Sequence, residues 1–308
     1  MLSISSLQQA RELGPTAVTI GKFDGIHRGH QALISALKGD AAVHNLKTVL
    51  VTFDRHPDAL LNPSRLKWPL IGPQQKAALV SEAGLDALLT LTFDEVLAQQ
   101  SAQDFVQETL VDGLQAKIVI VGEDFRFGSG GAGDVSLLHE LGQQLGFEVR
   151  VIPSATEGGL KVSTSAIREL LDLGDVAQAA SLLGRVHTTV GVIEHGLKIG
   201  RTIGFPTANM SREAEGYLPL DGVYAGWLVA DGVRYPAAHS VGINETFQAV
   251  PRLVESHVLD RKDLDLYDKN VTLEYVDFVR PSAKFDGVES LVAEINRDLD
   301  KIRNILGI

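Results

Sequence analysis

The sequence predicts an α/β domain with a parallel sheet, followed by an antiparallel β-barrel or sandwich that ends in a helix. The chain of 308 residues is long enough for two domains that each bury a core. Short β-rich runs alternate with helical runs in the first half, which is typical of a parallel sheet covered by helices. After Gly184, strand runs separated by Gly and Asp replace this alternation. We therefore expect domains at residues 1–184 and 185–308.

The elements of the first half follow from this alternation. The β-rich runs are 16–20, 47–53, 86–93, 117–121 and 147–152, and the helical runs between them are 30–39, 73–84, 101–115 and 135–146. Runs 47–53 and 117–121 are apolar almost throughout, as expected for strands buried on both faces. Because the carboxyl ends of parallel strands share one edge of a sheet, we expect the functional residues at that edge.

The second half contains antiparallel strands after a helical stretch at residues 165–184. Asp231-Gly232 separates two strand runs, and this dipeptide is a strong signal for a two-residue hairpin turn. The strand runs are 224–230, 233–241, 252–259 and 271–279.

A terminal helix closes the chain. We expect it to begin at Asp286, with Glu289 three residues later as in a capping box. Apolar residues recur at helical spacing and predict the face that packs on the core. They are Val288, Leu291, Val292, Ile295, Leu299 and Ile302.

Composition limits the classes of function. The chain has 28 basic and 39 acidic residues, a net charge of −11, which argues against broad binding to nucleic acid or to an anionic membrane surface. It has no Cys, so a thiolate nucleophile, a disulfide and a Cys-ligated zinc are excluded. The first residues lack the features of a signal peptide, and no apolar run reaches the length of a membrane span. We expect a soluble, cytoplasmic protein that binds small anions at locally built sites.

The first candidate site follows the strand run 16–20 and opens the next helix. Its sequence is Gly-Lys-Phe-Asp-Gly-Ile-His-Arg-Gly-His, and backbone N–H groups at such a turn favour phosphate. His27 and His30 are three residues apart, so both imidazoles can face one ligand and donate hydrogen bonds to phosphoryl oxygens. The alternatives are a core role for His30 and a zinc pair, for which no third ligand has fitting spacing. The candidate phosphate-binding residues here are Gly21, Phe23, Asp24 and Gly25.

The second candidate site is a glycine-spaced loop at residues 191–209. Its spacing differs from a Walker A motif, and a plain surface loop is the alternative to phosphate binding. Lys198 and Arg201 can offset phosphate charge, and Gly204 precedes a polar turn. Thr207 and Asn209 carry oxygen atoms of the kind that Mg²⁺ prefers.

The first site and three later segments resemble the nucleotidyltransferase domain of bacterial bifunctional riboflavin kinase/FAD synthetases. These segments are 52–57, 121–128 and 163–168. The resemblance implies a Rossmann-like fold and assigns Ser163, Thr164 and Arg168 to the β- and γ-phosphates of ATP. Ala166 stands where that family often has Arg.

Residues that follow the strands of the first half are candidates for holding the flavin or adenine ring. A packing role is the alternative for Phe53 and Phe125, because aromatic side chains usually belong to cores. The candidates are Phe53, His56, Asn62, Asp124, Phe125 and Arg126.

The second half resembles the flavokinase domain of the same family, which implies a six-stranded barrel. In that family the Pro-Thr-Ala-Asn element, here residues 206–209, holds the metal, and the Glu that corresponds to Glu255 is the catalytic base. Without the resemblance, an outward-facing strand carboxylate is the plainer interpretation of Glu255. Residues 242–247 and Asp268 depart from the family pattern.

The resemblance implies two reactions: riboflavin and ATP give FMN and ADP, and FMN and ATP then give FAD and pyrophosphate. Mg²⁺ is the implied cofactor, the partners are these small molecules rather than nucleic acid or membrane, and the oligomeric state is left open. The nearest alternative is a single-activity FMN adenylyltransferase with an impaired kinase half. A flavin-binding sensor and an aminoacyl-tRNA synthetase-like adenylating enzyme are further alternatives. For the last of these, the charge of −11 offers little to tRNA.

Overall fold

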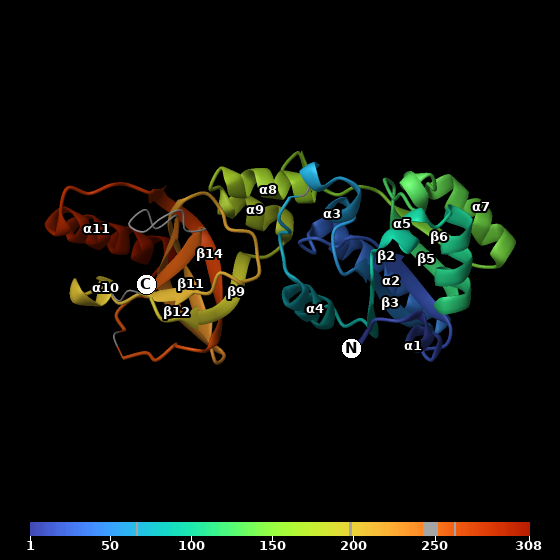
Figure 1. Ribbon diagram of the computed structural model, residues 1–308, viewed down its shortest axis with the longest axis horizontal. Coiled ribbons are helices and arrows are strands. Elements are labelled where there is room, and N and C mark those ends of the chain that lie inside the picture. The colour runs from blue at the N-terminus through green and yellow to red at the C-terminus, as the bar shows by residue number, and fades with distance from the viewer. Residues whose placement is uncertain (66, 197–198, 243–251, 262) are drawn as a thin grey trace. The chain divides into compact units, whose positions relative to one another are not determined.

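The computed structural model describes residues 1–308 except residues 66, 197–198, 243–251 and 262 (Figure 1). The chain forms two compact units. The first comprises residues 1–69 and 73–162, and the second comprises residues 70–72 and 163–308.

A six-stranded parallel sheet forms the centre of the first unit, as the alternation of runs predicts. Its strand order is β1-β4-β3-β2-β5-β6. The strands are β1 (Leu2–Ile4), β2 (Thr16–Ile20), β3 (Lys47–Phe53), β4 (Ala87–Leu91), β5 (Ala116–Gly122) and β6 (Glu148–Ile152). The pattern of the sequence does not predict the edge strand β1, whose 3 residues are too few to show a period.

Helices cover both faces of this sheet (Figure 1). On one face, α2 (Arg28–His44) packs against β2, β3 and β5. On the other, Val18 and Ile20 of β2 join a buried cluster with Leu110 and Leu138 from the later helices. Successive side chains of a strand point to opposite faces, so β2 contributes to both cores and is buried along its whole length.

The remaining helices of the first unit are short or irregular. The helical run expected at 101–115 is two segments, of which the second is π-helical. The elements are α1 (Leu7–Arg11), α3 (Asp58–Leu61), η1 (Pro63–Arg65), α4 (Pro73–Glu82), α5 (Glu95–Gln99), α6 (Ala102–Phe105), η2 (Val106–Gly113), η3 (Ser129–Gly131) and α7 (Val135–Leu145), with a two-stranded ribbon of β7 (Thr156–Glu157) and β8 (Leu160–Lys161).

The strand order creates a switch point between β2 and β5. From β2 the chain continues to β3 and β4 on one side of the sheet, and then to β5 and β6 on the other side. Parallel α/β sheets bind ligands at the carboxyl ends of the strands where the order reverses in this way. The turn at residues 21–27 and the segment at residues 123–127 both leave the sheet there.

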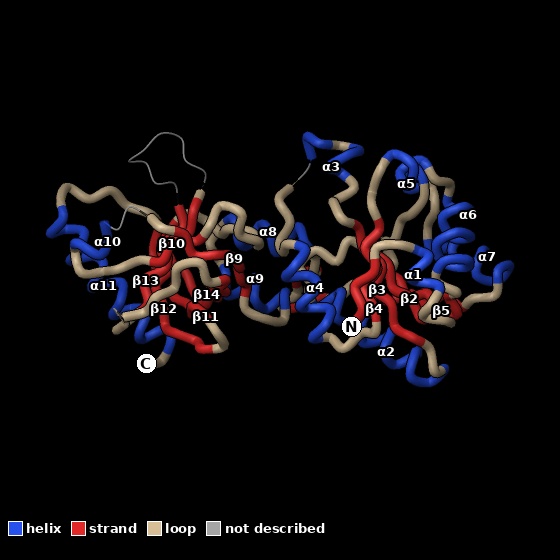
Figure 2. The backbone as a smooth tube through the Cα atoms, turned by 60° about the horizontal axis from the view of Figure 1, so that its bottom comes forward, coloured by secondary structure: helices blue, strands red, loops and turns tan. Residues whose placement is uncertain are grey.

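The second unit contains a closed antiparallel barrel, in the order β10-β13-β12-β11-β14-β9 (Figure 2). This confirms the six-stranded barrel. The strands are β9 (His187–Glu194), β10 (Ala208–Met210), β11 (Gly222–Ala230), β12 (Val233–Gly242), β13 (Leu253–Val258) and β14 (Asn270–Pro281). Asp231 and Gly232 have φ values of 50° and 76° and join β11 to β12, as a tight hairpin turn requires.

Two helices precede the barrel and belong to the same compact unit. They are α8 (Thr164–Asp172) and α9 (Val176–Leu183), separated at Gly174, whose φ is 80°. Helix α9 packs against β9 and β14, and the Leu220 N–H donates to the Leu171 carbonyl oxygen at 2.8 Å. The spatial division between the units therefore lies between Val162 and Ser163, before the position at Gly184 where the sequence pattern changes.

The terminal helix α11 (Val288–Leu306) lies against β11, β12 and β14 on the outside of the barrel (Figure 2). Leu299 and Ile302 of the predicted stripe are buried, whereas Val288 in the first turn is 60% exposed. The expected start at Asp286 is wrong: Gly287 is the N-cap and no side chain caps the helix. Contacts with the barrel hold α11 in place instead.

Candidate active sites

The turn at residues 21–27 has an unusual backbone. Phe23 and Ile26 have φ values of 46° and 41°, and Gly25 between them has φ 88°. Non-glycine residues rarely adopt such values. The Phe23 side chain is fully buried, so an apolar anchor lies within the turn. Burial of an apolar anchor therefore supports a strained turn at the switch point.

His27 and His30 pair at the start of α2. His27 is the N-cap residue, and its Nδ1 accepts a hydrogen bond from the His30 N–H at 3.3 Å. The two rings stack with their centroids 3.7 Å apart, and the Phe23 ring lies 4.8 Å from the His30 ring. A Cβ at Gly29 would lie 3.2 Å from the His27 ring, so a small residue favours this stacking. The structure thus brings the predicted histidines together at a helix N-terminus.

Lys76 is a residue that the sequence pattern does not single out. Its ammonium donates hydrogen bonds to the Lys22 carbonyl oxygen at 2.8 Å and to Thr52 Oγ1 at 3.2 Å. Burial lowers the pKa of Lys76, and the nearby carboxylate of Asp24 acts in the opposite direction. Lys76 is one of several polar residues in α4, so the spacing of residues along the sequence does not mark it as a functional residue.

The segment predicted to hold ATP phosphates starts the second unit. Ser163 is the N-cap of α8, and its Oγ accepts a hydrogen bond from the Ala166 N–H at 3.2 Å. Thr164 begins that helix. The Arg168 guanidinium lies over the Tyr217 ring, 5.7 Å from the centroid, and is buried. These contacts give the segment a structural role within its own unit, and its phosphate-binding role stays a prediction.

The residues predicted to hold a flavin or adenine ring make contacts of their own. The Phe53 ring meets the Phe93 ring edge to face at 5.5 Å, and the Phe125 ring stacks on the Phe127 ring at 5.5 Å. Both phenylalanines border the apolar core. Asn62 is the C-cap of α3.

The polar members of this group lie within 4.0 Å of charged neighbours. His56 is paired with Asp58, Asp124 with Lys161, and Arg126 with Asp134. Their flavin-binding role stays a prediction.

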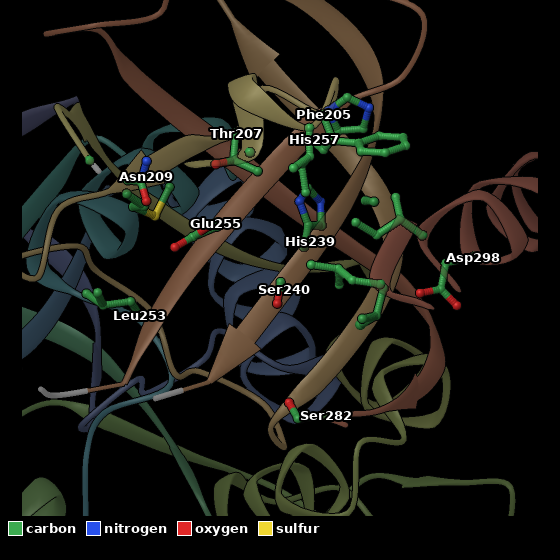
Figure 3. Close-up of a pocket in the computed structure, with 18 of the residues that line it drawn as sticks. Phe205, Thr207, Asn209, His239, Ser240, Leu253, Glu255, His257, Ser282 and Asp298 are labelled. Atoms are coloured by element: carbon green, nitrogen blue, oxygen red, sulfur yellow. The ribbon is translucent and has the colours of Figure 1, made fainter. Parts of the chain in front are cut away.

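A cavity of about 680 Å³ lies on the outer face of the barrel, next to α11 (Figure 3). Its lining includes Thr207, Asn209 and Glu255 on one side, whereas Asp298 comes from α11. In β13, Val254 and Ser256 are buried in the barrel, so the alternating residue Glu255 points outward into this cavity.

Glu255, Thr207 and Asn209 meet because β10 and β13 are neighbours. Asn209 is directly paired with Glu255 in the antiparallel register. The Thr207 hydroxyl donates a hydrogen bond to the Glu255 carboxylate. Burial raises the pKa of Glu255, and the bond from Thr207 offsets part of that rise. The result is a desolvated carboxylate beside two neutral oxygen donors.

Glycine residues before Thr207 allow close contacts of the backbone near Thr207, Asn209 and Glu255. A Cβ at Gly196 would lie 2.4 Å from Asn209 Nδ2, and a Cβ at Gly200 would lie 2.3 Å from the Phe205 carbonyl oxygen. Gly204 has φ 94°. Arg201 is in the short helix α10 (Ile199–Thr202), and the predicted phosphate ligand Lys198 lies outside the described residues.

The donor set fits a hard divalent cation. Thr207 and Asn209 supply neutral oxygens, and such ions take oxygen ligands. Within the described part of the chain, no group of three or more His, Cys, Asp or Glu residues is placed to hold a metal. An ion at Thr207 and Asn209 would take its other ligands from nucleotide phosphates and water.

Other polar residues of the cavity have structural partners. His257 Nδ1 lies 2.8 Å from the Pro206 carbonyl oxygen, and its ring meets the Phe205 ring edge to face. His257 shares the outward face of β13 with Glu255, and strand alternation alone predicts this placement. Burial lowers the pKa of His239 to about 4, so this ring is uncharged at neutral pH.

Helix α11 contributes a buried ion pair. Arg280 Nε donates to Asp298 Oδ2 at 2.8 Å and lies 3.7 Å from Glu294 Oε1. Asp298 is 3% exposed, and burial raises its pKa against the effect of Arg280. This ion pair connects α11 to β14.

Comparison with known families identifies two domains. A FAD synthetase family model matches residues 9–166, and a riboflavin kinase family model matches residues 183–306. The chain therefore combines a FAD synthetase domain with a riboflavin kinase domain. Because both domains are present, a single-activity enzyme is not favoured.

Full-length relatives then identify the family. Bifunctional riboflavin kinase/FMN adenylyltransferases of Escherichia coli (strain K12), Listeria monocytogenes and Pseudomonas fluorescens are 34%, 34% and 35% identical to this chain. The alignments cover 99%, 91% and 92% of this chain and 97%, 89% and 91% of the relatives. The chain belongs to the family of bifunctional riboflavin kinase/FMN adenylyltransferases.

A solved structure has the same architecture. A crystal structure described as a macrolide-efflux protein from Streptococcus pneumoniae matches with a TM-score of 0.87 and 31% identity over 98% of each chain. In the described residues of the present chain, no helix is long and apolar enough to span a bilayer.

Proposed function

We propose that the barrel cavity phosphorylates riboflavin to FMN and that Glu255 is the general base. The observation that carries this proposal is the placement of the desolvated Glu255 carboxylate beside Thr207 and Asn209. A raised pKa makes a carboxylate a stronger base, and an alcohol needs a base to become a good nucleophile.

In the proposed kinase step, Glu255 accepts the proton of the ribityl 5′-hydroxyl as its oxygen attacks the γ-phosphorus of ATP, and ADP leaves. Thr207 and Asn209 would hold Mg²⁺, which supplies charge neutralisation for the phosphates. Thr207 also orients the Glu255 carboxylate through its hydrogen bond. Arg201 and Lys198 are the proposed cations for the phosphate oxygens.

The domain at residues 1–184 is the proposed site of adenylyl transfer. A phosphate oxygen of FMN attacks the α-phosphorus of ATP, and pyrophosphate leaves. The FMN phosphate is already an anionic nucleophile, so this step needs alignment and charge stabilisation rather than a base. His27 and His30 are the proposed donors to the phosphoryl oxygens. On the resemblance of residues 163–168 to the family segment alone, we propose Ser163, Thr164 and Arg168 as further phosphate-binding residues.

Further parts of the proposal rest on the sequence. We place the junction of the two family segments at residues 184–185, close to the start of the riboflavin kinase match at residue 183. We propose a cytoplasmic location and an enzyme that acts on riboflavin, FMN and ATP.

Incubation of the protein with riboflavin and MgATP tests the proposal, with FMN and FAD resolved by chromatography. We expect FMN to appear first and FAD to follow. A parallel reaction supplied with FMN measures the second step alone. FAD from FMN without FMN from riboflavin would support the single-activity alternative, and absence of both products would refute the proposal.

A further inference from the structure

Lys76 connects three elements at the edge of the sheet where the first site lies. It extends from α4 to the Lys22 carbonyl oxygen and to Thr52 Oγ1 at the end of β3. The Thr52 hydroxyl also donates to the Lys22 carbonyl oxygen, at 3.1 Å. Lys22 begins the turn that carries Phe23 and Asp24. These three hydrogen bonds therefore fix the start of that turn relative to the sheet.

Lys76 also affects the charge of the turn. Asp24 is 8% exposed, and its carboxylate interacts electrostatically with the Lys76 ammonium. Loss of this cation would remove one favourable interaction of a buried carboxylate and make the surroundings of the turn more negative. These more negative surroundings would repel anions at the neighbouring helix N-terminus. The charge of Lys76 is therefore relevant to ATP and FMN, both of which carry phosphate.

We infer that Lys76 is a positioning residue for adenylyl transfer, which holds the Lys22–Asp24 segment in place and balances the charge of Asp24. The inference rests on the proposed function of the first unit. A purely architectural lysine would support folding without changing the affinity for anionic substrates. The two roles therefore differ in the Michaelis constants and in the response to a conservative replacement.

The test compares Lys76→Met with Lys76→Arg in the full-length protein. Lys38→Met is the matched control, because Lys38 Nζ also donates to a backbone oxygen, that of Ala83 at 2.7 Å, in a loop before β4. The initial rate of FAD formation is measured against ATP and FMN concentration. Riboflavin phosphorylation by the same samples reports on the second unit.

We expect Lys76→Met to raise the KM for ATP and for FMN about tenfold or more, the usual effect of losing a charged hydrogen-bond donor. Lys76→Arg keeps the cation and should recover most of that loss. Lys38→Met should stay within about twofold of the unchanged protein, since an exposed lysine contributes little. The rate of riboflavin phosphorylation should be the same in all four proteins.

The inference is wrong if Lys76→Met keeps its Michaelis constants, or if Lys76→Arg and Lys76→Met are equally impaired. It is also wrong if the two activities fall in parallel. If Lys76→Met fails to fold, Thr52→Val is the test instead. We expect Thr52→Val to raise the KM by a smaller factor than Lys76→Met. An unchanged KM would overturn the inference. If the unchanged protein makes no FAD from FMN, the proposed function fails and not the role of Lys76.

Discussion

Glu255 combines two properties that a base for an alcohol requires. It lies on the outward face of β13, where the cavity removes it from bulk water, and it receives a hydrogen bond from Thr207. Desolvation favours the protonated form, so the pKa of Glu255 is raised above that of an ordinary glutamate. The same carboxylate on an exposed strand face would be a weaker base.

This raised pKa predicts the pH dependence of the kinase. Glu255 acts as a base only when it is deprotonated, so the rate of FMN formation should fall as the pH drops through its pKa. We expect the acid limb of kcat to lie above the pKa of a model glutamate, 4.5. Rates measured from pH 4.5 to 9 at saturating substrates check this. An acid limb at or below that value would contradict the role of Glu255.

Replacement of single residues should separate the two activities. Glu255→Gln should reduce FMN formation at least about 100-fold, because a positioned general base contributes a factor of this order. FAD formation from supplied FMN should be unchanged. His30→Ala should show the opposite result, since His30 belongs to the other unit. Chromatography of both reactions measures this, and equal loss of both activities in a folded variant would argue against separate sites.

At the scale of single elements, a charge pair adds to the apolar contacts that hold α11 on the barrel, and no side chain caps the helix. Arg280 from β14 meets Asp298, which is almost fully buried, and also lies close to Glu294. A buried ion pair adds little net stability, but removal of one partner leaves the other charge without compensation. The pair therefore specifies where the helix lies beside the cavity.

Replacement of Arg280 tests this account of the helix. Arg280→Leu should lower the free energy of unfolding by about 3–5 kcal/mol, the range for leaving a buried charge unpaired. Arg297→Leu is the control, because exposed Arg297 pairs with Glu294 on the same helix and should contribute about 1 kcal/mol or less. Denaturant unfolding of both variants provides the measurement. Equal effects of the two replacements would contradict the structural role of the pair.

At the scale of the whole molecule, α8 and α9 belong to the barrel unit although the sequence before Gly184 is helical like the first half. Four residues of α9 are buried. They are Val176, Ala179, Leu182 and Leu183. Full burial of a Val or Leu side chain is worth about 1.5–3 kcal/mol. A barrel without these helices would lose several such contributions.

Two fragments distinguish the spatial division from the change of sequence pattern. The fragment 163–308 should unfold at a temperature at least about 5 °C higher than the fragment 185–308, because it retains the packing of α9 on β9 and β14. It should also phosphorylate riboflavin. Thermal unfolding and the FMN assay check both points. Equal unfolding temperatures would show that α8 and α9 are dispensable for the barrel.

Much of this organisation could be predicted because it depends on local patterns. Strands such as 47–53 and 117–121 are marked by continuous apolar runs, and Asp231-Gly232 marks a hairpin. The pair His27 and His30 follows a strand and opens a helix, so its setting could also be inferred. The start of α11 could not, because Asp286 satisfies the local rule whereas the N-cap is Gly287. Helix ends are weakly specified and can differ by one or two residues from the position that a capping pattern indicates.

The sequence by itself determined the two domain classes, the order of their elements and the residue types available for phosphate chemistry, since each depends on spacing along the chain. Only the tertiary structure decided which of these residues are neighbours. The barrel register pairs Glu255 with Asn209, and the folded first unit places Lys76 of α4 against the Lys22 carbonyl. It also assigned α8 and α9 to the barrel. The physical reason is that burial and pairing join segments far apart in the chain, which no local period records.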